Sequence, residues 1–254
     1  MEFIQPTEIK EHMQELPSVA MKFNGYYIEE ELEDYLTLNV SGREMLSYDI
    51  QSERRSHGHG SIRYGKSLPS RLITVQYYLK ADNSAELQYR FNKLRKVLYS
   101  EDVVPIEFAD EPDVTYYGEF EGAEEVPNDR LSIVSTFTIF CPDPFKYRNA
   151  IVTDGEVVTE TFYPTIPHKI LVSTSTTTNA IDISNGNQVI QLRGEVNAGT
   201  DIQIDVENQS VYANGVERLD LIDLHSDFEN FTVENGQTVT TSNGTIELHV
   251  REVV

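Results

Sequence analysis

Apolar and polar residues alternate over much of this chain, and the alternation predicts β-strands in both halves. Residues 35–40 and 45–50 alternate on either side of Ser41-Gly42, which predicts two strands around a turn. Further apolar or alternating runs lie at 71–79, 103–108, 116–120, 131–140, 170–172, 189–192, 202–206, 210–212 and 246–250. The first 34 residues lack such a pattern and are expected to be irregular. The expected fold class is therefore mainly β.

One segment, residues 84–99, has a helical period instead. Its apolar residues recur at spacings of four, three and four, at Leu87, Phe91, Leu94 and Leu98. Asn83 is placed to cap the start, and Glu86 stands at the third helical position to complete a capping box. Polar residues, Arg90 among them, occupy the remaining faces. The pattern predicts one amphipathic helix against a sheet.

The sequence Cys141-Pro142-Asp143-Pro144 interrupts the strand at 131–140, because proline cannot donate to a ladder and restricts the residue before it. Beyond it, short strands follow one another with no helical period. Asn-Gly pairs, which favour tight turns, begin at Asn185, Asn214, Asn235 and Asn243. We expect an α+β N-terminal domain over residues 1–145 and a C-terminal β-sandwich over residues 146–254.

The chain is strongly acidic, with 20 Lys and Arg against 42 Asp and Glu and a net charge of -22. Residues 1–149 contribute 16 minus 26, or -10, and residues 150–254 contribute 4 minus 16, or -12. Nucleic-acid binding normally depends on clustered basic residues that neutralise phosphates. The composition therefore indicates a surface that repels DNA.

Candidate catalytic and metal chemistry is sparse. The single cysteine, Cys141, excludes an intrachain disulfide and any zinc site built on paired cysteines. Two imidazoles, His57 and His59, could contribute to a metal site, but no third ligand is recognisable and a polar loop is the simpler interpretation. The motifs of P-loop enzymes, serine hydrolases and zinc proteases are missing from the sequence, as are a signal peptide and a long apolar segment. We expect no enzyme, no cofactor and no membrane span.

Two carboxylates and two tyrosines are candidates for the hydrolysis or binding of carbohydrate. Asp201 and Asp205 share a strand face, but at four residues apart they are separated by roughly 13 Å. A retaining glycosidase needs about 5 Å. Tyr163 or Tyr212 could stack on a sugar in a chain without tryptophan, although a structural tyrosine is the simpler interpretation of each.

Short motifs along most of the chain, in a fixed order, resemble the distal tail protein (Dit) family of long-tailed phages that infect Gram-positive bacteria. The matching segments are 70–75, 94–98 and 116–122 in the first half, the 192–196 and 199–205 strands with their Leu-x-Gly and Gly-x-x-Ile-x-Ile-Asp patterns, and the loop 226–231. The exit from the first half at 141–145 also matches.

The resemblance implies a structural protein of the virion, made in the host cytoplasm and placed at the distal end of the tail. It implies a homo-hexameric ring formed by the N-terminal domains, with galectin-like or carbohydrate-module-like C-terminal domains. The implied partners are the tail tube protein, the tail-associated fibre or lysin protein and receptor-binding proteins that act in host adsorption. DNA would pass through the channel without specific binding.

Residues 53–71 form a stretch poor in aliphatic side chains, which predicts a long loop or a projecting hairpin. The cations of this region are Arg54, Arg55, Arg63, Lys66, Arg71 and the more distant Lys80. Since like charges oppose association of an acidic chain, we expect this basic segment to contact the acidic segment 29–34 of a neighbouring subunit. The candidate interface residues are Arg54, Arg55, Arg63 and Lys66 with Glu30 and Glu31. A solvated loop is the alternative.

The alternative function is carbohydrate binding. The C-terminal sandwich could make the chain a carbohydrate-binding accessory protein that recognises host cell-wall glycans.

Overall fold

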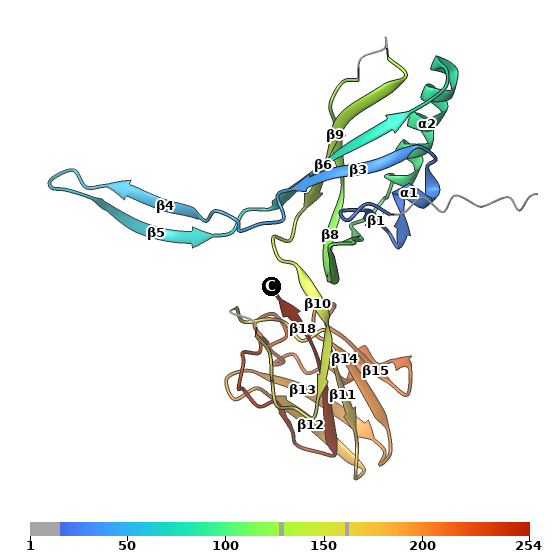
Figure 1. Ribbon diagram of the computed structural model, residues 1–254. Helices are drawn as coiled ribbons and strands as arrows, with labels where there is room; N and C mark the ends of the chain where they lie inside the picture. Colours follow the sequence, from blue (N-terminus) through green and yellow to red (C-terminus); the bar gives the residue numbers. More distant parts are fainter. Residues whose placement is uncertain (1–15, 127–129, 161–162) are drawn as a thin grey trace, which may run out of the picture. The chain divides into compact units, whose positions relative to one another are not determined.

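The computed structural model describes residues 16–126, 130–160 and 163–254 (Figure 1). The chain divides into two compact units. Unit 1 comprises residues 1–112 and 117–144, and unit 2 comprises residues 113–116 and 145–254. The division into domains at residues 1–145 and 146–254 stays a prediction. The mainly β class is confirmed, because strands form most of the regular structure of both units.

Unit 1 is built on antiparallel strands with two helices. Its elements are β1 Met21–Phe23, β2 Tyr26–Tyr27, α1 Ile28–Glu31, β3 Tyr35–Ser41, β4 Asp49–Arg54, β5 Ser61–Ser67, β6 Arg71–Lys80, α2 Ser84–Val97, β7 Val104–Phe108, β8 Glu111–Ala123 and β9 Ser132–Cys141. Strands β3, β6, β9 and β8 are neighbours in this order, and β1 pairs with β2 and β7. Alternate residues of β6 and β9 are buried, as a sheet with one face on the core requires.

The irregular start predicted for the first 34 residues is wrong for the described part of that segment. Two short strands and α1 lie there, and Ile28 and Leu32 are fully buried. Elements of two to four residues are too short to produce a recognisable period. The described residues of this half contain two helices, so the prediction of a single helix is corrected.

The helix predicted at 84–99 is confirmed as α2 and ends at Val97, with Leu98 as its C-terminal cap. The Asn83 side chain accepts a hydrogen bond from the Glu86 backbone N–H at 2.9 Å, and the Glu86 carboxylate accepts from the Asp82 N–H at 2.9 Å. Leu87, Leu94 and Leu98 are buried. The capped amphipathic pattern therefore gives both the position and the buried face.

The turn predicted between residues 35–40 and 45–50 does not pair those two runs. β3 pairs with β6, and β4 pairs with β5. The second run is also displaced, because residues 45–48 are not in a strand and β4 begins at Asp49. Alternation here locates the strand only in part and does not identify its partner. At Gly42 the chain leaves the main sheet, where a Cβ atom would lie 2.0 Å from the Leu72 carbonyl oxygen and the positive φ also favours glycine.

Unit 2 is a sandwich of two sheets around one apolar core. Its elements are β10 Tyr147–Thr153, β11 Lys169–Ser173, β12 Thr178–Ser184, β13 Val189–Val196, β14 Asp201–Asp205, β15 Ser210–Ala213, β16 Val216–Glu217, a 3-10 turn Leu219–Leu221, β17 Thr240–Thr241 and β18 Thr245–Val253. One sheet has the order β16-β15-β14-β11-β18-β10, and the other has the order β13-β12-β17. Residues of both, such as Ile170, Ile183 and Ile204, belong to one buried cluster.

Each asparagine of the four Asn-Gly pairs uses its side-chain oxygen to hold a backbone N–H. Asn214 accepts from Asp201 N–H at 3.0 Å, Asn235 from Thr159 N–H at 3.1 Å, and Asn243 from Ser175 N–H at 3.1 Å. Asn185 accepts from the N–H groups of residues 187 and 188. The predicted turns are therefore also cross-links between segments.

Cys141 lies at the end of β9 and is fully buried. Burial raises the pKa of its thiol to about 11. Since the thiolate is the reactive form, we expect no reaction of the native protein with an aromatic disulfide reagent at pH 8, and stoichiometric reaction in denaturant. Rapid labelling without denaturant would contradict the burial of this thiol.

Candidate inter-subunit interface

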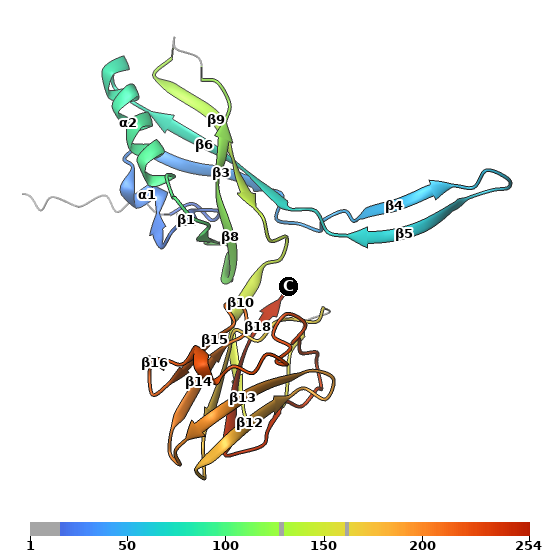
Figure 2. The same ribbon diagram turned by 180° about the vertical axis from the view of Figure 1, so that it is seen from behind.

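Strands β4 and β5 form a separate two-stranded hairpin, residues 49–67, which we call the arm. Figures 1 and 2 both show it extending away from the other elements of unit 1. Within the described residues its strands pair only with each other, and all their residues except Gly65 are exposed. An isolated two-stranded hairpin is marginally stable in water. The arm therefore has the properties of an element that gains its partner in an assembly.

The base of the arm is fixed by Arg71, the first residue of β6. Its guanidinium donates to the carbonyl oxygens of Gly42 at 2.8 Å, Glu44 at 3.0 Å and Pro144 at 2.9 Å. Only 5% of the residue is exposed. Arg71 is thus a structural side chain, and its grouping with the cations of the arm is corrected.

A second arginine, Arg43, fixes the chain just before the arm. It donates two hydrogen bonds to the Asp110 carboxylate, at 2.7 and 2.8 Å, and its guanidinium lies 4.7 Å from the centre of the Phe108 ring. The hydrogen bond from Arg43 holds the pKa of Asp110 below its ordinary value. Arg43 and Asp110 are 67 residues apart, so no local pattern in the sequence could reveal this anchor.

The register of the arm decides which side chains share a face. Ile50 pairs with Lys66, Ser52 with Arg63, and Arg54 with Ser61. Directly opposed residues point to the same side of a ladder, and residues two apart on a strand do so as well. The face made by these three pairs, here called the basic face, is made up of Ile50, Ser52, Arg54, Ser61, Arg63 and Lys66.

The opposite face contains Asp49, Gln51 and Glu53 with their partners Ser67, Gly65 and Ile62. The Tyr64 hydroxyl donates to the Glu53 carboxylate at 2.6 Å, which raises the pKa of that hydroxyl. Tyr64 is the extra residue at a register shift, since Gln51 pairs with Gly65 and Ser52 already pairs with Arg63. The arm therefore carries three cations on one face and two carboxylates on the other.

Of the predicted interface residues, the structure brings Arg54, Arg63 and Lys66 onto one face. The Lys66 ammonium lies 3.2 Å from the centre of the Tyr48 ring. Arg55 follows β4 in the tip, beside His57, and both line a hollow of about 330 Å³ at the end of the arm. No group of three or more His, Cys, Asp or Glu side chains is placed to hold a metal ion anywhere in the described ranges.

Part of the acidic segment 29–34 interacts within its own subunit and is therefore less available for contact with a neighbouring subunit than the sequence suggested. The Glu29 carboxylate is buried and accepts the Thr37 N–H at 3.0 Å. Arg90, expected on a polar helix face, is buried and lies 2.7 Å from the Asp34 carboxylate and 3.8 Å from that of Glu33. Glu30 and Glu31, on α1, are exposed. They are the two acids of this segment that fit the predicted role.

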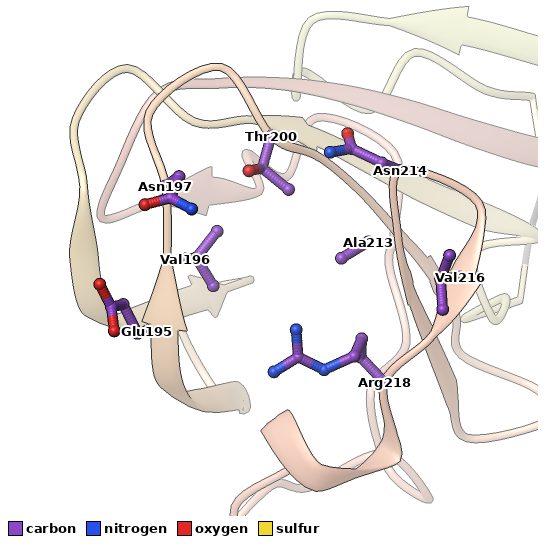
Figure 3. Close-up of a pocket in the computed structure, with 8 residues that line it drawn as sticks. All are labelled: Glu195, Val196, Asn197, Thr200, Ala213, Asn214, Val216 and Arg218. Atoms are coloured by element: carbon purple, nitrogen blue, oxygen red, sulfur yellow. The ribbon is translucent and has the colours of Figure 1, made fainter.

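Unit 2 has a pocket of about 370 Å³ at its β15–β16 end (Figure 3). Its lining residues are Glu195, Val196, Asn197, Thr200, Ala213, Asn214, Val216 and Arg218. The Arg218 guanidinium extends into it and is held by two 2.8 Å hydrogen bonds to Asp220. None of the eight is aromatic, so this pocket offers no stacking surface of the kind that sugar sites use, and it does not favour carbohydrate binding.

Three of the other candidate carbohydrate residues, Asp201, Asp205 and Tyr163, have structural partners, and the fourth, Tyr212, lies on β15 between β14 and β16. Asp201 accepts from the Ser173 hydroxyl at 2.6 Å, and Asp205 accepts from the Asn208 backbone and side chain at 2.9 Å. The Tyr163 ring lies 5.2 Å from that of Phe145, centre to centre. In the part of the chain that the structure describes, no helix is long and apolar enough to cross a bilayer.

Two family models match separate parts of the chain. The model described as a phage tail protein RIFT-related domain matches residues 47–139, which include the arm. The model described as the siphovirus-type tail component, C-terminal domain, matches residues 160–252. The distal tail protein of Bacillus phage SPP1 is 29% identical over 222 residues, which are 81% of this chain and 86% of that protein.

Solved structures show the same fold. The crystal structure of the SPP1 distal tail protein, described as a paradigm of the hub adsorption apparatus in phages infecting Gram-positive bacteria, matches with a TM-score of 0.78 at 21% identity. The match covers 92% of this chain and 98% of that one. The phage p2 baseplate in its activated conformation with calcium matches with a TM-score of 0.54 at 9% identity, over 86% and 90% of the two chains. The chain therefore belongs to the siphophage distal tail protein family and is a structural component of the tail, located at its distal end in the virion.

Proposed function

We propose that the chain forms a six-fold homo-oligomeric ring at the tip of the phage tail. The ring joins the tail tube to the fibre or lysin protein and provides docking sites for receptor-binding proteins during host adsorption. Family membership supports this role. A head-to-tail contact repeated by rotation closes into a ring, and an arm on each copy is suited to such a contact.

The main support for the proposal is that the arm is exposed while its base is held by hydrogen bonds. Arg71 and Arg43 fix the point from which the arm leaves unit 1. The strands beyond that point pair with no other strand among the described residues, and Ile50 is 56% exposed and Tyr64 is 64% exposed. A fixed base and an uncovered ribbon are what a contact with the next subunit requires.

Charge complementarity gives the contact its chemistry. Arg54, Arg55 and Arg63 provide a positive region on a chain with a net charge of -22, and Glu30 and Glu31 of the next copy provide an acidic counterpart. The acidic balance of the whole chain also suits a channel through which DNA passes without being held.

Reversing Arg54, Arg55 and Arg63 to glutamate is expected to weaken assembly while the melting temperature of the monomer stays within about 2 °C, because exposed charges contribute little to folding. Mass measured by light scattering at low and moderate salt tests this, together with the amount of variant found in tails from cells that supply it in trans.

A matched variant identifies the acidic partner. Adding Glu30→Arg and Glu31→Arg to the triple variant is expected to restore part of the assembly, because the contact is then reversed on both sides. Undiminished assembly of the triple variant, in solution and in tails, would assign the arm to the solvent and remove this support for the ring.

A further inference from the structure

The register shift at Tyr64 places all three cations of the two arm strands on one face and leaves the other face with carboxylates alone. We propose, on the basis of the ring described above, that the arm contacts the second copy through the basic face alone and that the register shift at Tyr64 acts by placing Arg63 on that face. The partner is an acidic surface of another copy of this chain. The opposite face, with Asp49 and Glu53, stays outside the contact.

The effect of the bulge follows from the pairing. In a regular ladder continuing from the pair of Gln51 and Gly65, Ser52 would oppose Tyr64, and Glu53 would oppose Arg63. Arg63 would then lie among the carboxylates, and that face would carry both signs of charge, while the other face would keep only two cations, Arg54 and Lys66. The extra residue shifts the pairing beyond it by one position, so that Arg63 opposes Ser52 and joins Arg54 and Lys66.

Charge separation of this kind determines orientation as well as attraction. The chain has 42 acidic residues against 20 Lys and Arg, so the surface that the arm meets on a second copy is acidic on average. Arg54, Arg63 and Lys66 are attracted to such a surface, whereas Asp49 and Glu53 are repelled by it. An arm with cations on both faces could bind either way round. The separated arm favours one orientation, which a repeating head-to-tail contact needs in order to close.

The contact also has an apolar component on the same face. Ile50 lies opposite Lys66 and is 56% exposed, and the Lys66 chain covers the Tyr48 ring at the base of the arm. Burial of Ile50 adds the non-directional attraction that exposed charges do not provide. The basic face thus combines attraction with orientation.

Two one-residue changes distinguish the effect of grouping the cations on one face from the effect of the bulge itself, and neither alters the net charge. Insertion of a serine between Gln51 and Ser52 makes the ladder regular and moves Arg54 and Arg63 to the face opposite Lys66. Deletion of Tyr64 also makes the ladder regular but leaves Arg54, Arg63 and Lys66 together. Both variants lose the bulge, and only the insertion divides the cations.

We expect the insertion to weaken assembly by on the order of tenfold and the deletion to change it by less than about twofold. The readouts are the mass of the pure protein by light scattering and the amount of each variant in tails purified from cells that supply it. Circular dichroism and melting temperature establish that both variants are folded. Since the arm lies outside the hydrophobic cores, we expect both variants to have the melting temperature of the wild type.

Each other outcome has a definite meaning. Normal assembly of the insertion variant would show that the face does not matter and would overturn the inference. Loss of assembly in both variants would show that the bend of the bulge matters rather than the grouping of the cations, which also overturns it. Failure of the wild type to associate in solution and in tails would instead refute the ring itself.

Discussion

Changing Asn185 to aspartate is expected to destabilise unit 2 by about 3 kcal/mol or more, because it removes two buried donors. The residue is 3% exposed, and its amide nitrogen donates to the Thr232 carbonyl at 2.7 Å and to the Gln188 side-chain oxygen. In the aspartate variant a carboxylate oxygen would face the Thr232 carbonyl oxygen and the Gln188 side-chain oxygen, and none of the three can donate a hydrogen bond. The oxygen that accepts from the N–H groups of residues 187 and 188 would be unaffected.

The same substitution at Asn214 is the matched control, since it also precedes a glycine in a turn. Asn214 is exposed, and its side-chain oxygen accepts from Asp201 N–H, a bond that a carboxylate can keep. We expect a change within about 0.5 kcal/mol. Urea unfolding of the two variants at pH 7 makes the comparison. Equal losses would show that the buried amide donors of Asn185 carry no special share of the stability.

Changing Arg71 to methionine is expected to have the second large effect, about 3 kcal/mol, and to act on the arm as well. Methionine can fill the buried volume, but the carbonyl oxygens of Gly42, Glu44 and Pro144 would lose the donors that hold them. Two of these carbonyls lie in the segment that leads to the arm. Limited proteolysis should then cleave residues 42–48 faster than in the wild type.

The exposed cation Arg95, in the last turn of α2, provides the control. Its replacement by methionine removes the same charge from the same unit, and we expect a loss below about 0.5 kcal/mol with unchanged proteolysis. Arg71→Lys adds a second comparison, because a single ammonium cannot reproduce the planar fork of the guanidinium. Wild-type cleavage rates in the Arg71→Met variant would contradict its role at the base of the arm.

The sequence predicts best where one local pattern determines the structure. Helix α2 follows from apolar spacing and the cap at Asn83, both of which lie within one short segment. The Asn-Gly turns and the end of β9 at Cys141 are equally local. The partner of a strand does not depend on a local pattern. Alternation therefore could not predict that β3 pairs with β6 rather than with β4.

The candidate interface shows the same limit. Composition alone identifies the segment with Arg54 and Arg63 as a basic region within an acidic chain. Which side chains share a face depends on the position of a single extra residue at Tyr64, and alternation gives no such position. Burial of Arg90 and Arg71 was equally hidden, because their carbonyl and carboxylate partners come from distant segments.

The Asn-Gly turns have a consequence for the chemical ageing of the particle. At Asn-Gly, cyclisation of the side chain onto the following backbone nitrogen is the least hindered, and the product is aspartate or its isomer. In the structure, every asparagine of these pairs has its amide oxygen committed to a distant or neighbouring N–H. Cyclisation needs the side chain to rotate until its carbonyl carbon meets the following backbone nitrogen, and a side chain held by such a bond rotates less freely, so we expect local opening to set the rate. A virion has no means of replacing its proteins, and these hydrogen bonds therefore prolong the time for which an unadsorbed tail keeps an intact tip.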